Sequence, residues 1–151
     1  MVKLKIIPPL VMVVFGVLMY ILYRHLPFGE FDFFGRNELA VILLGLALVT
    51  MFLALFQFIR AKTTTNPIKV STASSLVTNG IFRYTRNPMY LAMLLILIAY
   101  GLKLGNAFNT LLAAGFVYYM NHFQIKPEEE ALGRLFGKDY RLYCKQVRRW
   151  F

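Results

Sequence analysis

The sequence predicts an all-α integral membrane protein with about four transmembrane helices and a C-terminal amphipathic helix in the membrane interface. The 151-residue chain is 58% hydrophobic and only 16% charged, which is too apolar for an ordinary soluble domain. Its uncharged runs span 6–23, 39–59, 87–102 and 104–125. Three of these runs reach the roughly 18–20 residues that a helix needs to cross a bilayer, and a single lysine separates the shorter third run from the fourth.

The first two predicted spans cover about 6–23 and 38–59. Lys3 and Lys5 precede the first run, but no small-residue cleavage site follows it. We therefore expect a retained span rather than a cleaved signal peptide. The connection between the two spans is short and rich in phenylalanine, and such aromatic residues suit a membrane interface.

A longer polar segment, 60–87, separates the second and third spans. It is rich in Thr and Ser and contains the turn pairs Asn66-Pro67 and Asn79-Gly80. Connections of this length are usually either functional or disordered. Leu76 and Ile81 are apolar and favour burial, which argues against disorder without excluding it.

The third and fourth predicted spans, about 88–102 and 107–124, form a tight hairpin. Lys103 lies in its turn, where a lysine can extend its ammonium group to the membrane interface.

The tail, 126–151, carries two stripes at helical spacing. The apolar stripe consists of Leu132, Phe136, Tyr140, Tyr143, Val147 and Trp150, and the basic stripe of Arg134, Lys138, Arg141, Lys145 and Arg148. The stripes are offset by two residues, about 200° on a helix. This pattern is typical of a helix lying in the membrane interface, with Gly137 as a candidate break. A tail helix packed on the protein, with its basic face in solvent, gives the same pattern and is compatible with the first interpretation.

The basic residues are distributed unevenly along the chain, whose formal net charge is +10. With four spans, one side of the membrane receives 14 Lys and Arg residues and the other side receives 3. Loops rich in Lys and Arg remain in the cytoplasm, so both termini and the segment 60–87 are predicted to be cytoplasmic. Topology and anionic lipid then account for the positive charge, and we expect no nucleic-acid partner.

Charged residues lie at the start and at the finish of the predicted hairpin, and both positions face the cytoplasm in this topology. Arg86-Asn87-Pro88 precedes the third span, and Pro127 is followed by three glutamates after the fourth. Each motif can be an ordinary helix start, with Asn as cap, Pro in the first turn and acidic residues at the positive end of the dipole. The topology, however, brings Arg86 to the depth of Glu128 and Glu129. The pairing could be a plain ion pair or a clamp for a zwitterionic ligand.

The remaining candidate groups are few. The lone Cys144 excludes an intrachain disulfide and a cysteine-based metal cluster. His122 ends the fourth span, where an interfacial aromatic with a polar tip is its ordinary role. No Gly-rich phosphate loop, Ser/His/Asp set or metal-spaced His pair is present, so no metal site is predicted.

Two stretches, 76–91 and 128–150, resemble the isoprenylcysteine carboxyl methyltransferase and phospholipid methyltransferase family of integral membrane enzymes. Both halves of the family's cofactor motif are present, in order and separated by the hairpin. The first half is Gly80, Phe82, Arg86, Pro88 and Tyr90, and the second is Glu128, Glu129, Leu132, Phe136, Gly137 and Tyr140. The better-known members have His where this chain has Asn87. Asn does not titrate near neutrality, so a role as base is excluded and a binding role remains.

The resemblance implies one membrane methyltransferase domain, 1–151, that uses S-adenosylmethionine as methyl donor. The implied acceptor is lipophilic or embedded in the membrane, such as a prenylcysteine-like carboxylate, a lipid amine or a small thiol. The implied catalytic residues are Arg86 and Glu129. The implied cofactor-binding residues are Gly80, Arg86, Asn87, Pro88, Tyr90, Tyr119, His122, Glu128 and Glu129, and Tyr118 is a further candidate to face the sulfonium. Short bacterial relatives share Asn87, which implies a bacterial or archaeal inner membrane.

Two other classes of function remain open. A non-catalytic membrane protein could bind anionic lipid through the basic tail alone. A sterol-reductase-like membrane enzyme, which is similar in its C-terminal hairpin and tail, would bind NADPH instead. The acceptor and the oligomeric state are not encoded in any pattern of the sequence.

The charge distribution gives a test of topology. Reporter domains fused after Phe151 and within 27–35 should report opposite sides of the membrane, with the fusion after Phe151 in the cytoplasm. Activity of paired cytoplasmic and periplasmic reporters measures this directly. The same side for both fusions would contradict the four-span topology.

Overall fold

A computed structural model describes residues 6–26, 28–61 and 75–151. Residues 1–5, 27 and 62–74 lie outside the described residues, and with them Lys3, Lys5, the Asn66-Pro67 turn and much of the predicted segment 60–87. The described residues are mostly helical, as predicted. Its helices are α1 (Pro8–His25), α2 (Arg36–Arg60), η2 (Gly80–Arg83), α3 (Pro88–Leu104), α4 (Asn109–Tyr119), the π-helical η3 (Met120–Ile125) and α5 (Lys126–Gln146).

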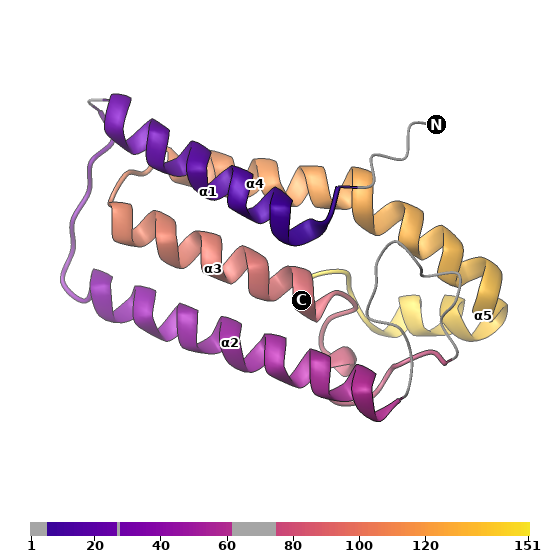
Figure 1. Ribbon diagram of the computed structural model, residues 1–151. Coiled ribbons are helices and arrows are strands. Elements are labelled where there is room, and N and C mark those ends of the chain that lie inside the picture. The colour runs from indigo at the N-terminus through magenta and orange to yellow at the C-terminus, as the bar shows by residue number, and fades with distance from the viewer. Residues whose placement is uncertain (1–5, 27, 62–74) are drawn as a thin grey trace.

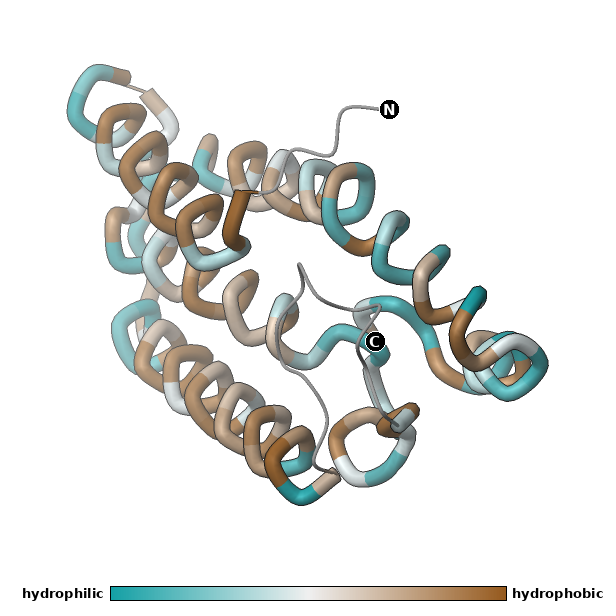
Figure 2. The backbone as a smooth tube through the Cα atoms, turned by 45° about the vertical axis from the view of Figure 1, so that its right-hand side comes forward, coloured by the Kyte–Doolittle hydropathy of each residue, from teal (hydrophilic) through white to brown (hydrophobic). Residues whose placement is uncertain are grey.

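Most of the large apolar side chains of the first two helices point outward. Within the described residues, α1 and α2 are long and apolar enough to cross a membrane, and only 17% of each apolar stretch is buried. Val41, Phe52 and Ile59 of α2 are 69%, 67% and 73% exposed. Apolar residues line α1, α2 and α3, whereas α5 is largely polar (Figure 2). The core helix of a soluble protein is mostly buried, so this arrangement indicates a membrane protein.

The contact between α2 and α3 is the most extensive between any two helices, and small side chains occupy the buried face of α2. The buried residues of α2 are Ala40, Ala47 and Ala54, spaced seven apart along one face. On α3, Ala92 and Ala99 are buried. Small residues let helix backbones approach closely where lipid supplies no hydrophobic drive for association. This contact fixes the position of α3, which lies between α2 and the pair α1 and α4 (Figure 1).

The larger side chains of the core lie between α1, α3 and α4. Met19, Leu97, Phe116 and Met120 are almost fully buried in one cluster. The ring of Phe15 packs edge-on against Phe116, with ring centroids 5.7 Å apart. The cluster holds the hairpin of α3 and α4 against α1.

Backbone pairing closes one end of the bundle. Glu30 and Asn106 form an antiparallel bridge, and the Phe31 amide donates to the Gly105 carbonyl at 2.9 Å. The Asn106 side chain donates to the Phe28 carbonyl at 2.9 Å. The connection from α1 to α2 is therefore tied to the turn between α3 and α4. At the opposite end of the bundle, α2 stops and α3 begins. We call this part of the bundle the basic end, because Arg60, Arg83 and Arg86 lie there.

The predicted fourth span and the predicted tail helix join directly in the structure. α4, η3 and α5 follow one another without interruption, with helical dihedral angles at Met120, Ile125 and Lys126. Glu128 and Glu129 therefore lie inside a continuous helical rod rather than at a free helix start. A proline inside a helix lacks a backbone donor, and its ring clashes with the carbonyl four residues earlier. For Pro127 that carbonyl belongs to Phe123, within the wider π-helical turn that accommodates it.

The predicted break at Gly137 is confirmed, but the tail helix ends earlier than predicted. Gly137 has φ 50° and ψ −113°, a conformation that favours glycine, and the rest of α5 turns back toward the start of α3 (Figure 1). The helix ends at Gln146, and Val147 is extended. The carbonyls of Arg148 and Arg149 bond to residues 85–87 instead of continuing the helix.

The apolar stripe of α5 faces the protein. Tyr140, Tyr143 and Val147 are buried in a cluster with Ala54 and Phe82, and Leu132 and Phe136 pack against it. The basic stripe residues Arg134, Lys138, Arg141, Lys145 and Arg148 are exposed. These contacts favour the interpretation in which the tail packs on the protein with its basic face outward.

Because alanines occupy the buried face of α2, a larger side chain at one of them is predicted to destabilise the protein. Ala47→Leu should destabilise the protein by about 1–3 kcal/mol, because extra methyl groups must force α2 away from α3. Leu48→Ala is the matched control, since Leu48 is 60% exposed and should change stability by less than about 0.5 kcal/mol. Thermal unfolding in detergent measures both variants. Equal effects would show that α2 and α3 do not pack through this face.

Candidate functional site

The chain after α5 returns to the start of α3 and is tied to it by backbone hydrogen bonds. The Arg86 amide donates to the Arg148 carbonyl at 3.0 Å. The hydroxyl of Thr85 and the side-chain amide of Asn87 both donate to the Arg149 carbonyl, at 3.1 Å and 2.9 Å. Asn87 is at the N-cap position of α3, but its side chain makes this long-range bond instead of a cap. The basic end is thus built from segments more than 60 residues apart in sequence.

Two guanidinium groups hold the carboxylate of Glu129. Arg86 donates to its Oε1 at 2.8 Å, and Arg149 donates to Oε1 at 2.9 Å and to Oε2 at 2.6 Å. The Arg86 and Glu129 side chains are 12% and 19% exposed, and that of Arg149 is 36% exposed. The bonds to Glu129 raise the pKa of Arg149 above its ordinary value. Short, forked pairs of this kind are the strong form of a charged hydrogen bond.

The neighbouring carboxyl group, Glu128, has a different environment. Its Oε1 accepts hydrogen bonds from the Tyr90 hydroxyl at 2.6 Å and from the Gln124 amide at 2.7 Å. Burial raises the pKa of Glu128 to about 7, although the bonds from Tyr90 and Gln124 act in the opposite direction. Consecutive residues point about 100° apart on a helix, which directs the two carboxyl groups to different partners. Both partners lie around the first turn of α3, because Arg86 and Tyr90 are four residues apart.

Two of the predicted site residues carry a polar atom that lacks a partner. Among the described residues, the Nε of Arg86 and the hydroxyl of Tyr119 are buried and make no hydrogen bond. A buried donor without a partner is costly, so such atoms are often satisfied by a ligand. Tyr119 packs beside Phe15 of α1, with ring centroids 6.5 Å apart. A free donor on Arg86 next to two carboxyl groups suits a ligand that carries both a negative and a positive charge.

Other predicted residues shape the approach to this cluster. Gly80 has a positive φ of 58°, and a side chain there would collide with the amide of Gln57. With its nitrogen toward the Asn79 carbonyl, the Gln57 amide bonds to both ends of this turn, at 2.6 Å to Asn79 and 3.0 Å to Ile81. Phe82 is buried, and its carbonyl accepts the Tyr143 hydroxyl at 2.7 Å. The segment before Arg86 is therefore fixed from both α2 and α5.

The structure does not bring every predicted residue to the cluster. His122 is exposed and stacks on Tyr118, with ring centroids 4.6 Å apart, and Tyr118 is itself 64% exposed. Pro88 is buried at the first position of α3 and has no polar group to offer. The cluster consists of Arg86, Tyr90, Glu128, Glu129 and Arg149, with Gln124, Thr85 and Asn87 as supporting residues.

Sequence reasoning missed Arg149, Gln124 and Thr85. Gln124 could have been found, because it precedes Glu128 by four residues and such pairs meet on one helix face. Arg149 could not have been found, because a tail helix that continued to Trp150 would have directed its side chain away from Glu129. Only the extended backbone after Gln146 brings its guanidinium to Glu129.

Comparison with known proteins supports these observations. The model of the phospholipid methyltransferase family matches residues 35–139, which is most of the chain. An uncharacterized protein of Haemophilus influenzae is 48% identical over 62 residues, or 41% of this chain and 98% of that protein. A protein-S-isoprenylcysteine O-methyltransferase of Schizosaccharomyces pombe is 35% identical over 72 residues, or 48% of this chain but only 30% of that enzyme. No solved structure matches the chain at a significant level.

The match covers the α2–α3 pair, the hairpin and the start of α5, including every member of the cluster except Arg149. The family is one of membrane methyltransferases, which agrees with the exposed apolar helices and with the resemblance drawn from the two motif halves. The chain belongs to the phospholipid methyltransferase family.

Proposed function

We propose that the protein transfers a methyl group from S-adenosylmethionine to a lipophilic or membrane-embedded acceptor. The observation that supports this most strongly is the meeting of Arg86 with Glu129 and of Tyr90 with Glu128 at the start of the α3–α4 hairpin. The methionine end of the proposed cofactor is a zwitterion. A guanidinium beside two carboxyl groups complements its two charges.

Each charge of the zwitterion has a candidate partner. Arg86 suits the carboxylate, because its buried Nε is a donor without a partner among the described residues. Glu129 suits the ammonium, and the fork from Arg149 keeps this carboxylate in place. Asn87 and Pro88 act indirectly. Asn87 holds the segment of Arg86 against the returning tail by its bond to the Arg149 carbonyl, and Pro88 begins α3 two residues after Arg86.

Two tyrosines are candidates to face the sulfonium of the cofactor. Tyr90 and Tyr119 lie on α3 and α4, and the ring faces of tyrosine attract a cation. The sulfonium supplies an activated methyl group, so the protein needs no nucleophile of its own. Alignment of donor and acceptor can then supply most of the barrier reduction, on the order of 7–11 kcal/mol. This agrees with a cluster that is rich in binding groups.

The proposed topology places the two substrates on different routes. We propose that α1, α2, α3 and the continuous α4 and η3 cross the membrane with the basic end in the cytoplasm, and that α5 lies at the cytoplasmic interface with its basic stripe toward anionic lipid. A polar cofactor then enters from water, and an apolar acceptor enters sideways from lipid. A prenylcysteine-like carboxylate, as the name of the S. pombe relative suggests, a lipid amine and a small thiol are the acceptor classes that we propose.

The clamp predicts a loss of cofactor affinity at one glutamate and not at another. Glu129→Gln should weaken S-adenosylmethionine binding by roughly 10- to 150-fold, because a partly buried charged hydrogen bond worth about 1.5–3 kcal/mol is lost. Glu130→Gln is the matched control, since Glu130 is adjacent and exposed, and it should stay within about threefold. Calorimetric titration of the purified chain measures both.

The same titration separates the other classes of function. A reductase would bind NADPH in the parallel experiment, and a non-catalytic lipid-binding protein would bind neither compound. Equal and small effects of the two substitutions on S-adenosylmethionine binding would contradict the clamp.

The environment of Glu128 predicts a dependence of stability on pH. A carboxyl group has a pKa of about 4.5 when exposed, whereas Glu128 titrates at about 7 in the folded protein. Between pH 4.5 and pH 7 this carboxyl group is ionised in the unfolded chain but still protonated in the folded protein. The free energy of unfolding therefore falls as pH rises from 4.5 to 7 and then stays level. The loss attributable to this group is on the order of 3 kcal/mol. Thermal unfolding at pH 5 and pH 8 should show this loss in the native protein and a smaller one in Glu128→Gln. If Glu128→Gln loses as much stability between pH 5 and pH 8 as the native protein does, the effect belongs to other groups.

A further inference from the structure

The residues after α5, 147–151, form a strap that places a guanidinium group in the candidate site. Backbone carbonyls of the strap accept hydrogen bonds from residues 85–87. The indole nitrogen of Trp150 donates to the Asn121 side chain at 3.1 Å, and its ring packs against the core of α1, α3 and α4. The backbone is therefore held on both sides of Arg149, while the side chain of Arg149 extends to Glu129.

Both carboxylate oxygens of Glu129 are occupied by guanidinium groups. Arg86 donates to Oε1, and Arg149 forks across Oε1 and Oε2. A carboxylate has about four lone-pair positions, so a further donor could still fit by number alone. An added ammonium group, however, would surround one partly buried carboxylate with three positive charges, which repel one another at this distance. Binding an ammonium group at Glu129 therefore favours the release of one guanidinium.

Arg149 is the partner that can leave. Its side chain is 36% exposed, whereas that of Arg86 is 12% exposed and carries the buried Nε that suits a ligand carboxylate. Rotation of the Arg149 side chain breaks its two hydrogen bonds to Glu129 and no others, because the carbonyl bonds and Trp150 hold the backbone of the strap. The contact is strong but reversible without unfolding.

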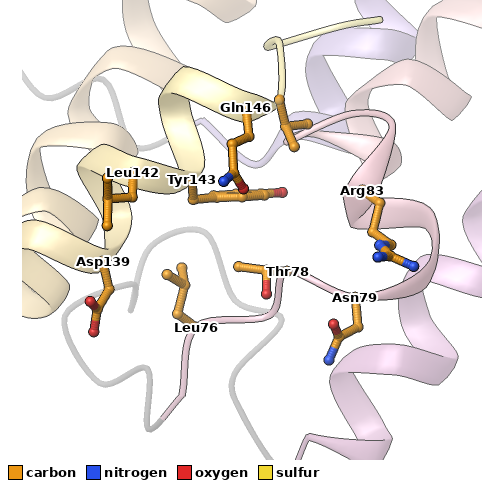
Figure 3. Close-up of a pocket in the computed structure, with 9 residues that line it drawn as sticks. Leu76, Thr78, Asn79, Arg83, Asp139, Leu142, Tyr143 and Gln146 are labelled. Atoms are coloured by element: carbon orange, nitrogen blue, oxygen red, sulfur yellow. The ribbon is translucent and has the colours of Figure 1, made fainter.

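The released side chain has room beside the strap. A cavity of about 580 Å³ lies between the segment that precedes α3 and the second half of α5, and Val147, two residues before Arg149, is part of its lining. Asp139 and Gln146 also line it, and their side-chain oxygens can accept hydrogen bonds from a guanidinium (Figure 3). Arg149 therefore needs no repacking of the core to leave Glu129.

The strap lies beyond the residues that the family model matches, which end at 139. We propose that Arg149 sets the affinity of the site by competing with the ligand for Glu129. Its guanidinium occupies the carboxylate until the ammonium group of the ligand replaces it. The carboxylate of the same ligand gains Arg86 in that step, which offsets the two bonds that Arg149 gives up. The proposal rests on the proposed function and concerns the regulation of the same site.

Removing the competitor tests the proposal, because it should tighten binding. If the fork occupies Glu129 in about four of five molecules, Arg149→Gln should strengthen S-adenosylmethionine binding roughly fivefold, since apparent affinity scales with the open fraction. Arg148→Gln is the matched control. Arg148 is adjacent and exposed, its side chain has no ion-pair partner in the described part of the chain, and its loss should change affinity by less than about twofold. Arg149→Lys keeps the charge but loses the fork, so its affinity should lie between those of the native chain and Arg149→Gln.

Calorimetric titration with S-adenosylmethionine measures each affinity, and the emission of Trp150, the single tryptophan of the chain, reports whether the strap stays docked. Tighter binding by Arg149→Gln, with Arg148→Gln close to the native chain, supports the competition. Weaker or unchanged binding by Arg149→Gln, or an equal gain in Arg148→Gln, overturns it and leaves the proposed function standing. If the native chain and every variant fail to bind the cofactor, both proposals are wrong. If Arg149→Gln loses the docked strap, Arg149→Lys decides, and binding no tighter than that of the native chain overturns the competition.

Discussion

The carboxylate of Glu129 is the group on which the arrangement of the basic end depends. A carboxylate removed from water is unstable unless charged partners replace its hydration, and removing one partner of a buried pair can cost several kcal/mol. Its two partners come from the start of α3 and from the chain beyond α5. Satisfying this one group therefore requires the hairpin to close, α5 to turn at Gly137 and the last residues to return to residues 85–87. The backbone amide of Arg86 and the side chains of Thr85 and Asn87, which donate to the carbonyls of residues 148 and 149, complete the same closure.

Much of the fold could be predicted because its main signals are local. The apolar runs of α1 to α3 are bounded by charge, proline or glycine, and the observed ends lie within two residues of the predicted ones. The meeting of Arg86 with Glu129 followed from hairpin topology, which places the start of one helix beside the end of the next. The break at Gly137 could be predicted because glycine is the weakest residue in an otherwise continuous helical pattern.

The remaining features depend on tertiary contacts that a pattern does not contain. Pro127 followed by glutamates has the composition of a helix start, but α4 already supplies a helix that continues through the π-helical turn. The amphipathic pattern of α5 shows that Tyr140 and Tyr143 need cover, yet it is equally satisfied by lipid and by Phe82 with Ala54. α5 ends at Gln146, beyond which the chain is extended and the carbonyls of Arg148 and Arg149 accept hydrogen bonds from residues 85–87. Arg149 was missed for this reason.

The alanine faces of α2 and α3 have a thermodynamic consequence. A long side chain that is held at an interface gives up rotamer freedom worth up to about 2 kcal/mol, whereas alanine has none to lose. Ala40, Ala47 and Ala54 on α2, with Ala92 and Ala99 on α3, therefore form the broadest helix contact without this entropic penalty. Most leucines of α2, with Phe52 and Phe56, face outward, where fluid acyl chains leave their rotamers free. Dispersion between closely spaced backbones therefore holds α3, the helix that positions Arg86, against α2. The large side chains of α2 keep their conformational entropy.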